Sequence, residues 1–419
     1  MTANRSAVLG SAPGRAALAG AILGALWFGC GEPDRPTEPQ EPIALDLGPE
    51  TPVGPGVTRT PLGYQAGLNA RVASLDLDGD GRQEIAVASA RGVAVIRIFD
   101  QGAAVVWQAP AHGGATALAS GDVDGDGIDD LVVGWGVHRE KLDAPARLVA
   151  YRSRGAPVDT LIEEEVAAPT TARAQFSSIS VTALEPDAGA GILYGYFASK
   201  YEVRAVFASR DEAGSWRERE LFVTRMGSEL AAGRFPPEAA SPLLFVGRPY
   251  GDELKSPGDV YALGPGPGGE RIPLPSVRGV RSLAVVDLGS IAEPIRRVCY
   301  GDGWHWKYKA EGRGLITCVG RRPGEDIFRS DAVVETAEYS ISALAAADLD
   351  GDGKRELVAA GGKRIYVLVP SQAEDGSLRW HWRPRGPGAY DLAVVDVDGD
   401  GRDEIALAGE EPALLRFSD

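Results

Sequence analysis

The protein has 419 residues, of which 24% are charged, and its formal net charge is −16. This acidic balance, without any run of basic residues, excludes nucleic acid as an expected partner. Three catalytic motifs are also absent: a Gly-x-Ser-x-Gly nucleophile elbow, a His-Glu-x-x-His zinc site and a phosphate-binding Gly-Lys-Ser/Thr loop. We therefore expect no hydrolytic active site.

The chain begins with a predicted export signal, residues 1–29. Arg5 and Arg15 give this segment its positive charge, and its apolar part ends at Phe28. This pattern is typical of a secretory signal peptide. The Gly-Cys pair that follows resembles the cleavage site of a bacterial lipoprotein, which makes Cys30 the expected lipidation site. Plain secretion and an uncleaved anchor are the alternatives.

Residues 30–56 are rich in proline, glycine and glutamate. Such a composition buries little apolar surface, so we expect an extended tether between a membrane and a folded domain at residues 57–419. The apolar part of the signal is too short for a transmembrane helix, and no other segment could span a membrane. The expected location is the bacterial cell envelope, either periplasmic or at the cell surface.

Four copies of one acidic motif dominate the folded part. They read DLDGDGRQE from Asp76, DVDGDGIDD from Asp122, DLDGDGKRE from Asp348 and DVDGDGRDE from Asp396. Positions 1, 3, 5 and 9 carry carboxylates, and glycines at positions 4 and 6 permit a sharp turn that brings the carboxylates together. Such oxygen ligands, with a backbone carbonyl at position 7, suit Ca²⁺, so we expect four calcium sites. The expected ligand residues are Asp76, Asp78, Asp80, Arg82 and Glu84; Asp122, Asp124, Asp126, Ile128 and Asp130; Asp348, Asp350, Asp352, Lys354 and Glu356; Asp396, Asp398, Asp400, Arg402 and Glu404.

An EF-hand is excluded for these loops, because it requires an acidic residue at position 12. That position holds Val87, Val133, Ala359 and Leu407. Short β-prone segments stand before and after each loop, so each unit is predicted to be a β-hairpin with the acidic loop at its turn. A solvated acidic turn without metal is the alternative.

The motif recurs at regular intervals, and this periodicity predicts the architecture. Strong repeats lie near residues 70–110, 114–166, 340–384 and 389–419, and three degenerate repeats without the ligand set occupy residues 176–337. Glu185, Arg234 and Asp287 stand at the first position of the degenerate copies.

Each unit has room for four strands; in the first they are expected near residues 70–77, 84–89, 93–99 and 104–108. We therefore predict an all-β fold, a seven-bladed β-propeller of four-stranded antiparallel blades with calcium-binding hairpin loops. The last unit ends after three strands. We expect residues 56–65 to supply its outer strand and so to close the ring.

The acidic loops resemble FG-GAP repeats of the VCBS type, which occur in integrin α-chain propellers and in many bacterial surface proteins. The resemblance covers residues 57–419, strongly in four units and weakly in three. It departs from the integrin pattern because no unit shows the Phe-Gly and Gly-Ala-Pro elements. The resemblance implies calcium binding by the four loops, but it implies no single activity.

Two cysteines remain beside the expected lipidation site. Cys299 and Cys318 are predicted on adjacent strands of the fifth unit. They could form a disulfide, in agreement with export, or remain two buried thiols.

Long turns on the face opposite the acidic loops are the candidate ligand-binding site. The turn in unit five reads DGWHWKYKAEGR, in which aromatic and cationic groups suit a sugar or a peptide anchor. The alternative is that its tryptophans cover the hydrophobic seam between blades. The candidate residues are Trp304, His305, Trp306, Tyr308 and Lys309, with Tyr250 on the neighbouring unit.

These observations predict a non-enzymatic, calcium-stabilised β-propeller at the cell envelope that binds a protein or carbohydrate ligand. One alternative is a calcium-assisted polysaccharide lyase with His305 or Lys309 as its base. The other is a purely structural envelope scaffold.

Overall fold

The structure is a computed structural model. It describes residues 41–418 apart from residues 68–69, 101, 137–145, 156–159, 170–174, 185–188, 200, 226–228, 236–238, 240, 250–257, 265–269, 276–278, 291–293, 303–313, 322–326, 337, 339 and 373–377. All the described residues belong to one compact unit, Pro36–Asp419.

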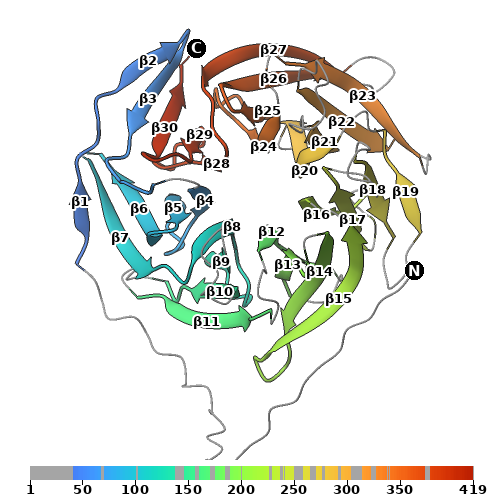
Figure 1. The fold of residues 1–419 in the computed structure, drawn as a ribbon. Coiled ribbons are helices and arrows are strands. Elements are labelled where there is room, and N and C mark those ends of the chain that lie inside the picture. The colour runs from blue at the N-terminus through green and yellow to red at the C-terminus, as the bar shows by residue number, and fades with distance from the viewer. Residues whose placement is uncertain are drawn as a thin grey trace, which may run out of the picture. The chain divides into compact units, whose positions relative to one another are not determined.

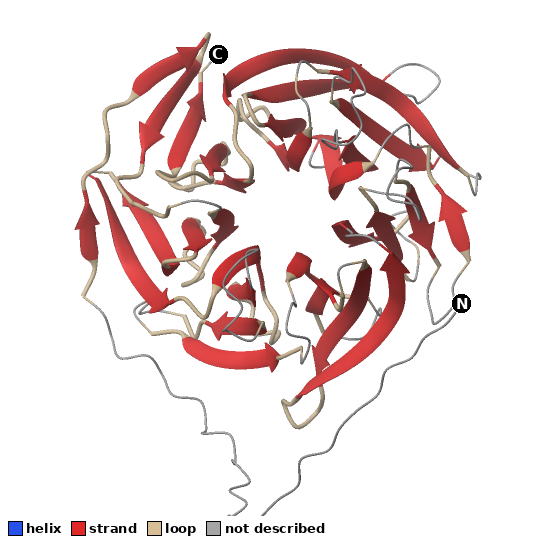
Figure 2. Ribbon diagram, viewed as in Figure 1, coloured by secondary structure: helices blue, strands red, loops and turns tan. Residues whose placement is uncertain are grey.

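The described residues form strands, turns and loops but no helix (Figure 2). Accordingly, none of them belongs to a helix long and apolar enough to cross a membrane. The predicted all-β fold is confirmed.

The first half of the unit contains four antiparallel sheets whose strands follow one another in chain order. The first sheet is β4 (Arg71–Leu75), β5 (Glu84–Ser89), β6 (Gly92–Phe99) and β7 (Gly102–Pro110), with β1 (Ile43–Leu45) at its outer edge. The second is β8 (Gly114–Gly121), β9 (Asp130–Gly136), β10 (Arg147–Arg152) and β11 (Ile162–Ala167). The third is β12 (Phe176–Thr182), β13 (Gly191–Phe197), β14 (Glu202–Arg210) and β15 (Trp216–Arg225). The fourth is β16 (Glu229–Gly233), β17 (Leu243–Gly247), β18 (Val260–Leu263) and β19 (Arg271–Pro273).

The second half repeats this antiparallel pattern. One group is β20 (Val280–Ser290), β21 (Ile295–Asp302), β22 (Leu315–Arg321) and β23 (Phe328–Glu335). The next is β24 (Ile341–Ala347), β25 (Lys354–Gly361), β26 (Arg364–Gln372) and β27 (Leu378–Pro387). The last is β28 (Leu392–Val395), β29 (Glu404–Leu407) and β30 (Ala413–Phe417), extended by β3 (Val57–Pro61) and β2 (Thr51–Gly54).

The sheets are arranged around a ring, with the first strand of each group innermost (Figure 1). The innermost strands contact one another in the closed order β4, β8, β12, β16, β20, β24 and β28, and β28 contacts β4 again. Apolar clusters fill the space between neighbouring sheets: Trp107 of β7 packs edge-on against Tyr151 of β10 with their ring centroids 5.0 Å apart. This radial arrangement is propeller-like.

Two neighbouring groups are joined more closely than the sequence predicts. Gly289 pairs with Arg355 and Ser290 with Lys354, so that β20 and β25 belong to one eight-stranded sheet. The long strand β20 allows this pairing, because it extends past the point where a hairpin loop was expected. Asp287 therefore lies inside β20 opposite Arg296, which donates hydrogen bonds of 2.7 and 2.6 Å to its carboxylate.

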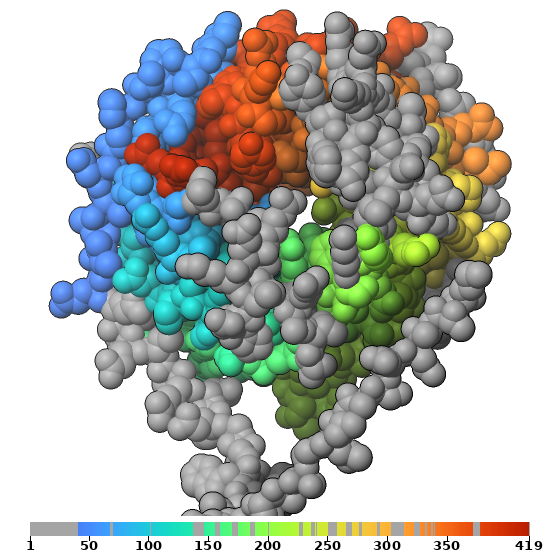
Figure 3. All heavy atoms as spheres, in the orientation of Figure 1, coloured from blue at the N-terminus to red at the C-terminus, as the bar shows by residue number. Residues whose placement is uncertain are grey.

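The ends of the chain meet in the last sheet. Strand β3 pairs with β30 from Val57↔Phe417 to Pro61↔Ala413, which confirms the predicted ring closure. Figure 3 shows this contact as blue residues lying beside red ones. The expected tether over residues 30–56 is too long, because β1 and β2 already lie in sheets within this segment. Residues 1–40, with the predicted signal and Cys30, lie outside the described residues.

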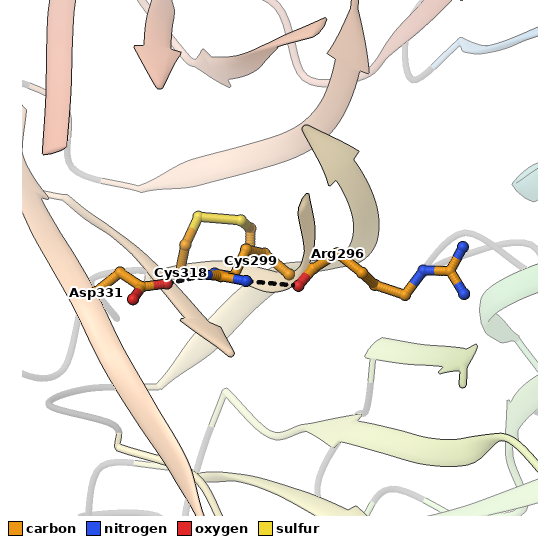
Figure 4. Close-up of a disulfide and its surroundings, with 5 residues drawn as sticks. Arg296, Cys299, Cys318 and Asp331 are labelled. Carbon is orange, nitrogen blue, oxygen red and sulfur yellow. Dashed lines mark hydrogen bonds and ion pairs between the residues drawn. A yellow bond between two sulfur atoms is a disulfide. The ribbon is translucent and has the colours of Figure 1, made fainter. Parts of the chain in front are cut away.

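A disulfide joins Cys299 of β21 to Cys318 of β22, which face each other across the two strands (Figure 4). Both residues are buried. Beside them, Arg297 forms an ion pair with Asp331 of β23. The bond therefore fastens two adjacent strands inside the apolar cluster between neighbouring sheets.

Replacement of both cysteines by alanine is expected to lower the free energy of unfolding by about 3 kcal/mol, because the bond closes a short loop in the unfolded chain. The sequence separation of the two cysteines is 19 residues. Urea unfolding of the double variant and of the oxidised protein measures the difference. A reductant should add nothing to the variant, and equal stability of the two proteins would contradict the disulfide.

Candidate metal centres

The four acidic loops occupy equivalent places in the fold. Each joins an innermost strand to the second strand of its group: β4 to β5, β8 to β9, β24 to β25 and β28 to β29. The apolar residue at position 2 points into the core and is buried in every copy, which anchors the loop to the sheet: Leu77, Val123, Leu349 and Val397. All four loops therefore lie at the same end of the innermost strands.

Glycines give the loops their shape. Gly79 and Gly81 have φ angles of 73° and 85°, a left-handed conformation that other residues rarely adopt. The turn directs backbone amides at the first carboxylate: Asp76 accepts hydrogen bonds from Gly79 at 2.8 Å and from Gly81 at 2.9 Å. Asp122 and Asp396 accept the equivalent pairs of bonds.

The acid at position 9 lies at or near the start of the second strand and is buried in every loop. In the first loop the Leu77 amide donates to Glu84 Oε2 at 3.0 Å, and the same bond between positions 2 and 9 recurs in the other three. Burial raises the pKa of each of these acids to about 7, which indicates that the surrounding protein offers their charge too little stabilisation. They are Glu84, Asp130, Glu356 and Glu404.

Carboxylate oxygens converge in each loop. In three loops one oxygen from each of positions 1, 3 and 5 lies within 4.8 Å of the others; in the loop from Asp122 the group comprises positions 1, 3 and 9. Two carboxylate oxygens of the residues in these groups, Asp124 Oδ1 and Asp348 Oδ1, are buried and have no hydrogen-bond partner among the described residues. A buried charged oxygen without a partner is costly. A divalent cation with oxygen ligands would satisfy these atoms, so the residues fit a metal ion and are compatible with calcium.

In three of the four loops, an arginine from the third strand of the same sheet contacts an acidic residue. These contacts were not predicted from the sequence. Arg97 lies 2.7 Å from Asp78 Oδ2 and 2.7 Å from Glu84 Oε1. Arg152 approaches Asp124 at 3.0 Å and Arg416 approaches Glu404 at 3.2 Å. The signal in the sequence is an arginine that follows apolar residues in each of these three third strands.

The loop from Asp348 differs at this point. The residue that corresponds to Arg97 is Val369, which is 45% exposed. A cavity of about 400 Å³ opens beside it, lined by Asp350, Asp352 and Glu356 among others. In this loop Asp350 and Asp352 are exposed, whereas Asp348 and Glu356 are buried.

Neighbouring loops are linked by reciprocal hydrogen bonds between position 1 of one loop and position 8 of the next. The Asp129 amide donates to the Asp76 carbonyl at 3.2 Å, and the Asp76 amide donates to Asp129 Oδ2 at 3.0 Å. Gln83 makes the same pair of bonds with Asp396, and Asp403 with Asp348. These bonds connect the loops in the order 348, 396, 76 and 122, which crosses the junction between the last and the first sheet. Position 8 was not singled out in the sequence.

Position 7 was expected to supply a carbonyl ligand. In each loop its amide donates to the carboxylate at position 5, at 2.8 or 2.9 Å. In the last loop the Arg402 side chain also donates to the Asp350 carbonyl of the neighbouring loop at 3.1 Å. The residues at this position are Arg82, Ile128, Lys354 and Arg402.

The candidate ligand-binding residues Trp304, His305, Trp306, Tyr308, Lys309 and Tyr250 lie outside the described residues. Of the degenerate first positions, Glu185 is also outside them, and Arg234 follows β16 without neighbouring acids. The structure therefore brings together the four acidic loops but gives no geometry for the aromatic turn.

Two segments of the chain match a known family model. The model of a family described as FG-GAP-like repeat matches residues 76–133 and 336–407. These two segments contain all four acidic loops and leave out the span with the degenerate copies. No curated protein matches the chain.

Proposed function

The chain is an FG-GAP-type repeat protein, and from this premise we propose that it is a seven-bladed β-propeller whose four acidic loops bind calcium. Seven innermost strands in a closed order of contacts support the number of blades. On this interpretation the eight-stranded sheet is two blades joined by the short pairing of β20 with β25.

Calcium is the cation we propose because the ligands are carboxylates and carbonyls, which are hard oxygen donors. Positions 1, 3, 5 and 9 would hold the ion with their side chains, and position 7 with its carbonyl. The bound ion would supply positive charge to carboxylates that otherwise repel one another. Arg97, Arg152 and Arg416 already supply part of that charge in three of the loops.

We further propose that the protein is a non-enzymatic binding module of the cell envelope, anchored through Cys30. The observation that carries this proposal is the position of the loops. They are all at one end of the innermost strands and are bonded to one another, so their ions would stabilise the ring. We place the binding site for a protein or carbohydrate ligand on the opposite face, with Trp304 and Trp306 as its proposed anchors.

Binding of the full-length protein to a glycan array, and to solubilised envelope proteins, tests this proposal. We expect calcium-dependent binding of a ligand. This binding should be lost when Trp304 and Trp306 are replaced by alanine, since buried aromatic anchors contribute much of the binding energy. Trp382→Ala is the matched control, because Trp382 is 42% exposed on the outermost strand β27. Unchanged binding by the double variant would refute the site, and no ligand for the folded protein would favour a structural scaffold.

A further inference from the structure

A cavity of about 590 Å³ lies where the innermost strands begin, and residues from all of them line it. Arg71 opens β4 and Asp391 immediately precedes β28, whereas the acidic loops follow the other ends of the same strands. At about 3.3 Å per residue, the two ends of such a strand are roughly 15 Å apart. The cavity is therefore separate from the acidic loops and lies on the opposite face.

Four charged side chains line this cavity: Arg71, Arg281, Glu229 and Asp391. Arg71 Nη1 lies 4.0 Å from Asp391 Oδ2, and these side chains remain 38% and 22% exposed. Asp391 is fixed in place, because its carboxylate accepts hydrogen bonds from the amides of Val72 at 3.3 Å and Leu392 at 3.1 Å. A cationic and an anionic group thus face the cavity from neighbouring strands.

The carboxyl group of Glu229 interacts electrostatically with Arg71 and Asp391. Burial raises the pKa of its carboxyl to about 7, and Asp391 acts in the same direction, while Arg71 and Arg281 act against the rise. Burial likewise raises the pKa of Asp391 in spite of Arg71. The two arginines therefore leave the two carboxylates incompletely stabilised, so a further cation in the cavity would be favourable.

An aromatic ring stands at the edge of the cavity. Tyr390 is 76% exposed although it directly precedes the fixed Asp391, and it is the most exposed large apolar side chain among the described residues. A tyrosine ring next to carboxylates suits an ammonium group, which its face attracts. The arginines Arg71 and Arg281 suit a carboxylate, since a guanidinium binds one through paired hydrogen bonds.

We propose that this cavity binds a small zwitterionic ligand of the amino-acid or short-peptide type. The ligand's ammonium group lies against Glu229, Asp391 and Tyr390, and its carboxylate lies against Arg71 and Arg281. The volume falls within the range of small-molecule sites, about 300–1,000 Å³.

Other ligand classes fit this charge pattern less well. A purely anionic ligand would meet two carboxylates, and a purely cationic ligand would meet two arginines. A neutral sugar would leave all four charges without a new partner of opposite sign. The site goes beyond the proposed function, because it is built from residues in or directly before the innermost strands and not from the aromatic turn.

Calorimetric titration of the full-length protein in mild detergent with trialanine tests the proposal. N-acetyl-trialanine and trialanine amide serve as probes that each lack one charge. We expect unblocked trialanine to bind, and either blocked peptide to bind at least about tenfold more weakly, as the loss of a hydrogen bond to a charged group implies. Equal binding of the three peptides, or no binding of trialanine by the folded protein, would overturn the proposal.

Variants locate the site. Glu229→Gln keeps the side-chain shape and removes the charge, so we expect at least about tenfold weaker binding of trialanine with an unchanged melting temperature. Tyr390→Ala changes an exposed position and should also weaken the binding of unblocked trialanine. Glu212→Gln is the matched control, since Glu212 is exposed in the turn between β14 and β15. Undiminished binding by both Glu229→Gln and Tyr390→Ala, or binding of D-galacturonate in preference to trialanine, would refute the assignment.

Discussion

Chelation of calcium is expected to remove most of the protein's stability. A ligand at about 100 times its dissociation constant stabilises a fold by about 2.7 kcal/mol. Four such sites would contribute about 11 kcal/mol, compared with a total of about 5–15 kcal/mol for a typical domain. Thermal unfolding followed by circular dichroism, in excess calcium and in excess EGTA, measures the effect.

Single-site variants separate metal loss from other effects of the chelator. Asp348→Asn removes one ligand charge and should reproduce at least a quarter of the EGTA effect. Asp287→Asn is the matched control, because Asp287 is the first position of a degenerate copy and is paired with Arg296. Loss of this ion pair should lower the free energy of unfolding by less than about 1 kcal/mol, the usual contribution of an ion pair near the surface. Equal melting temperatures with calcium and EGTA would contradict the four-site proposal.

The hydrogen bonds between neighbouring loops are expected to couple the effects of removing their ions. Each loop shares two backbone-anchored hydrogen bonds with its neighbour, as Asp403 does with Asp348. Distortion of one emptied loop therefore reaches the next. We expect the melting temperature to fall more steeply for the first ion removed than a sum of independent sites implies.

The elements that were predictable from the sequence are those with a strong local pattern. The acidic loops follow from the spacing of acids and glycines, and the closure by β3 follows from a last unit that is one strand short. Both depend on residues near each other in the chain or on a count of strands.

The features that were missed depend on contacts between distant residues. Arg97 reaches Glu84 from the adjacent strand, and Gln83 meets Asp396 only because the ring closes. The strands β1 and β2 lie in a proline-rich segment whose composition indicates a tether, yet each finds an unpaired outer strand to join. The charged cavity was missed for the same reason, since Arg71, Glu229 and Arg281 stand on three different strands and Asp391 immediately precedes a fourth.

Replacement of Val57 by asparagine is expected to open the ring. Val57 is 1% exposed and lies in the cluster formed with Leu415 of β30, so the substitution buries an amide without a partner. Loss of the apolar contact together with the unsatisfied amide should lower the free energy of unfolding by roughly 3 kcal/mol or more. Urea unfolding measures the loss, and hydrogen exchange locates it.

Thr58→Asn is the matched control, because the next residue of β3 points to the other, half-buried face. This substitution should lower the free energy of unfolding by less than about 1 kcal/mol. Faster hydrogen exchange in Val57→Asn should appear first in β28–β30 and then in the acidic loops from Asp396 and Asp76, since Gln83 and Asp396 connect these loops across the junction. Calcium should partly restore protection there, because ions bound on both sides of the junction hold the same two loops in register. Uniform exchange over all sheets would instead mean that β3 contributes to stability in general and has no special part in closing the ring.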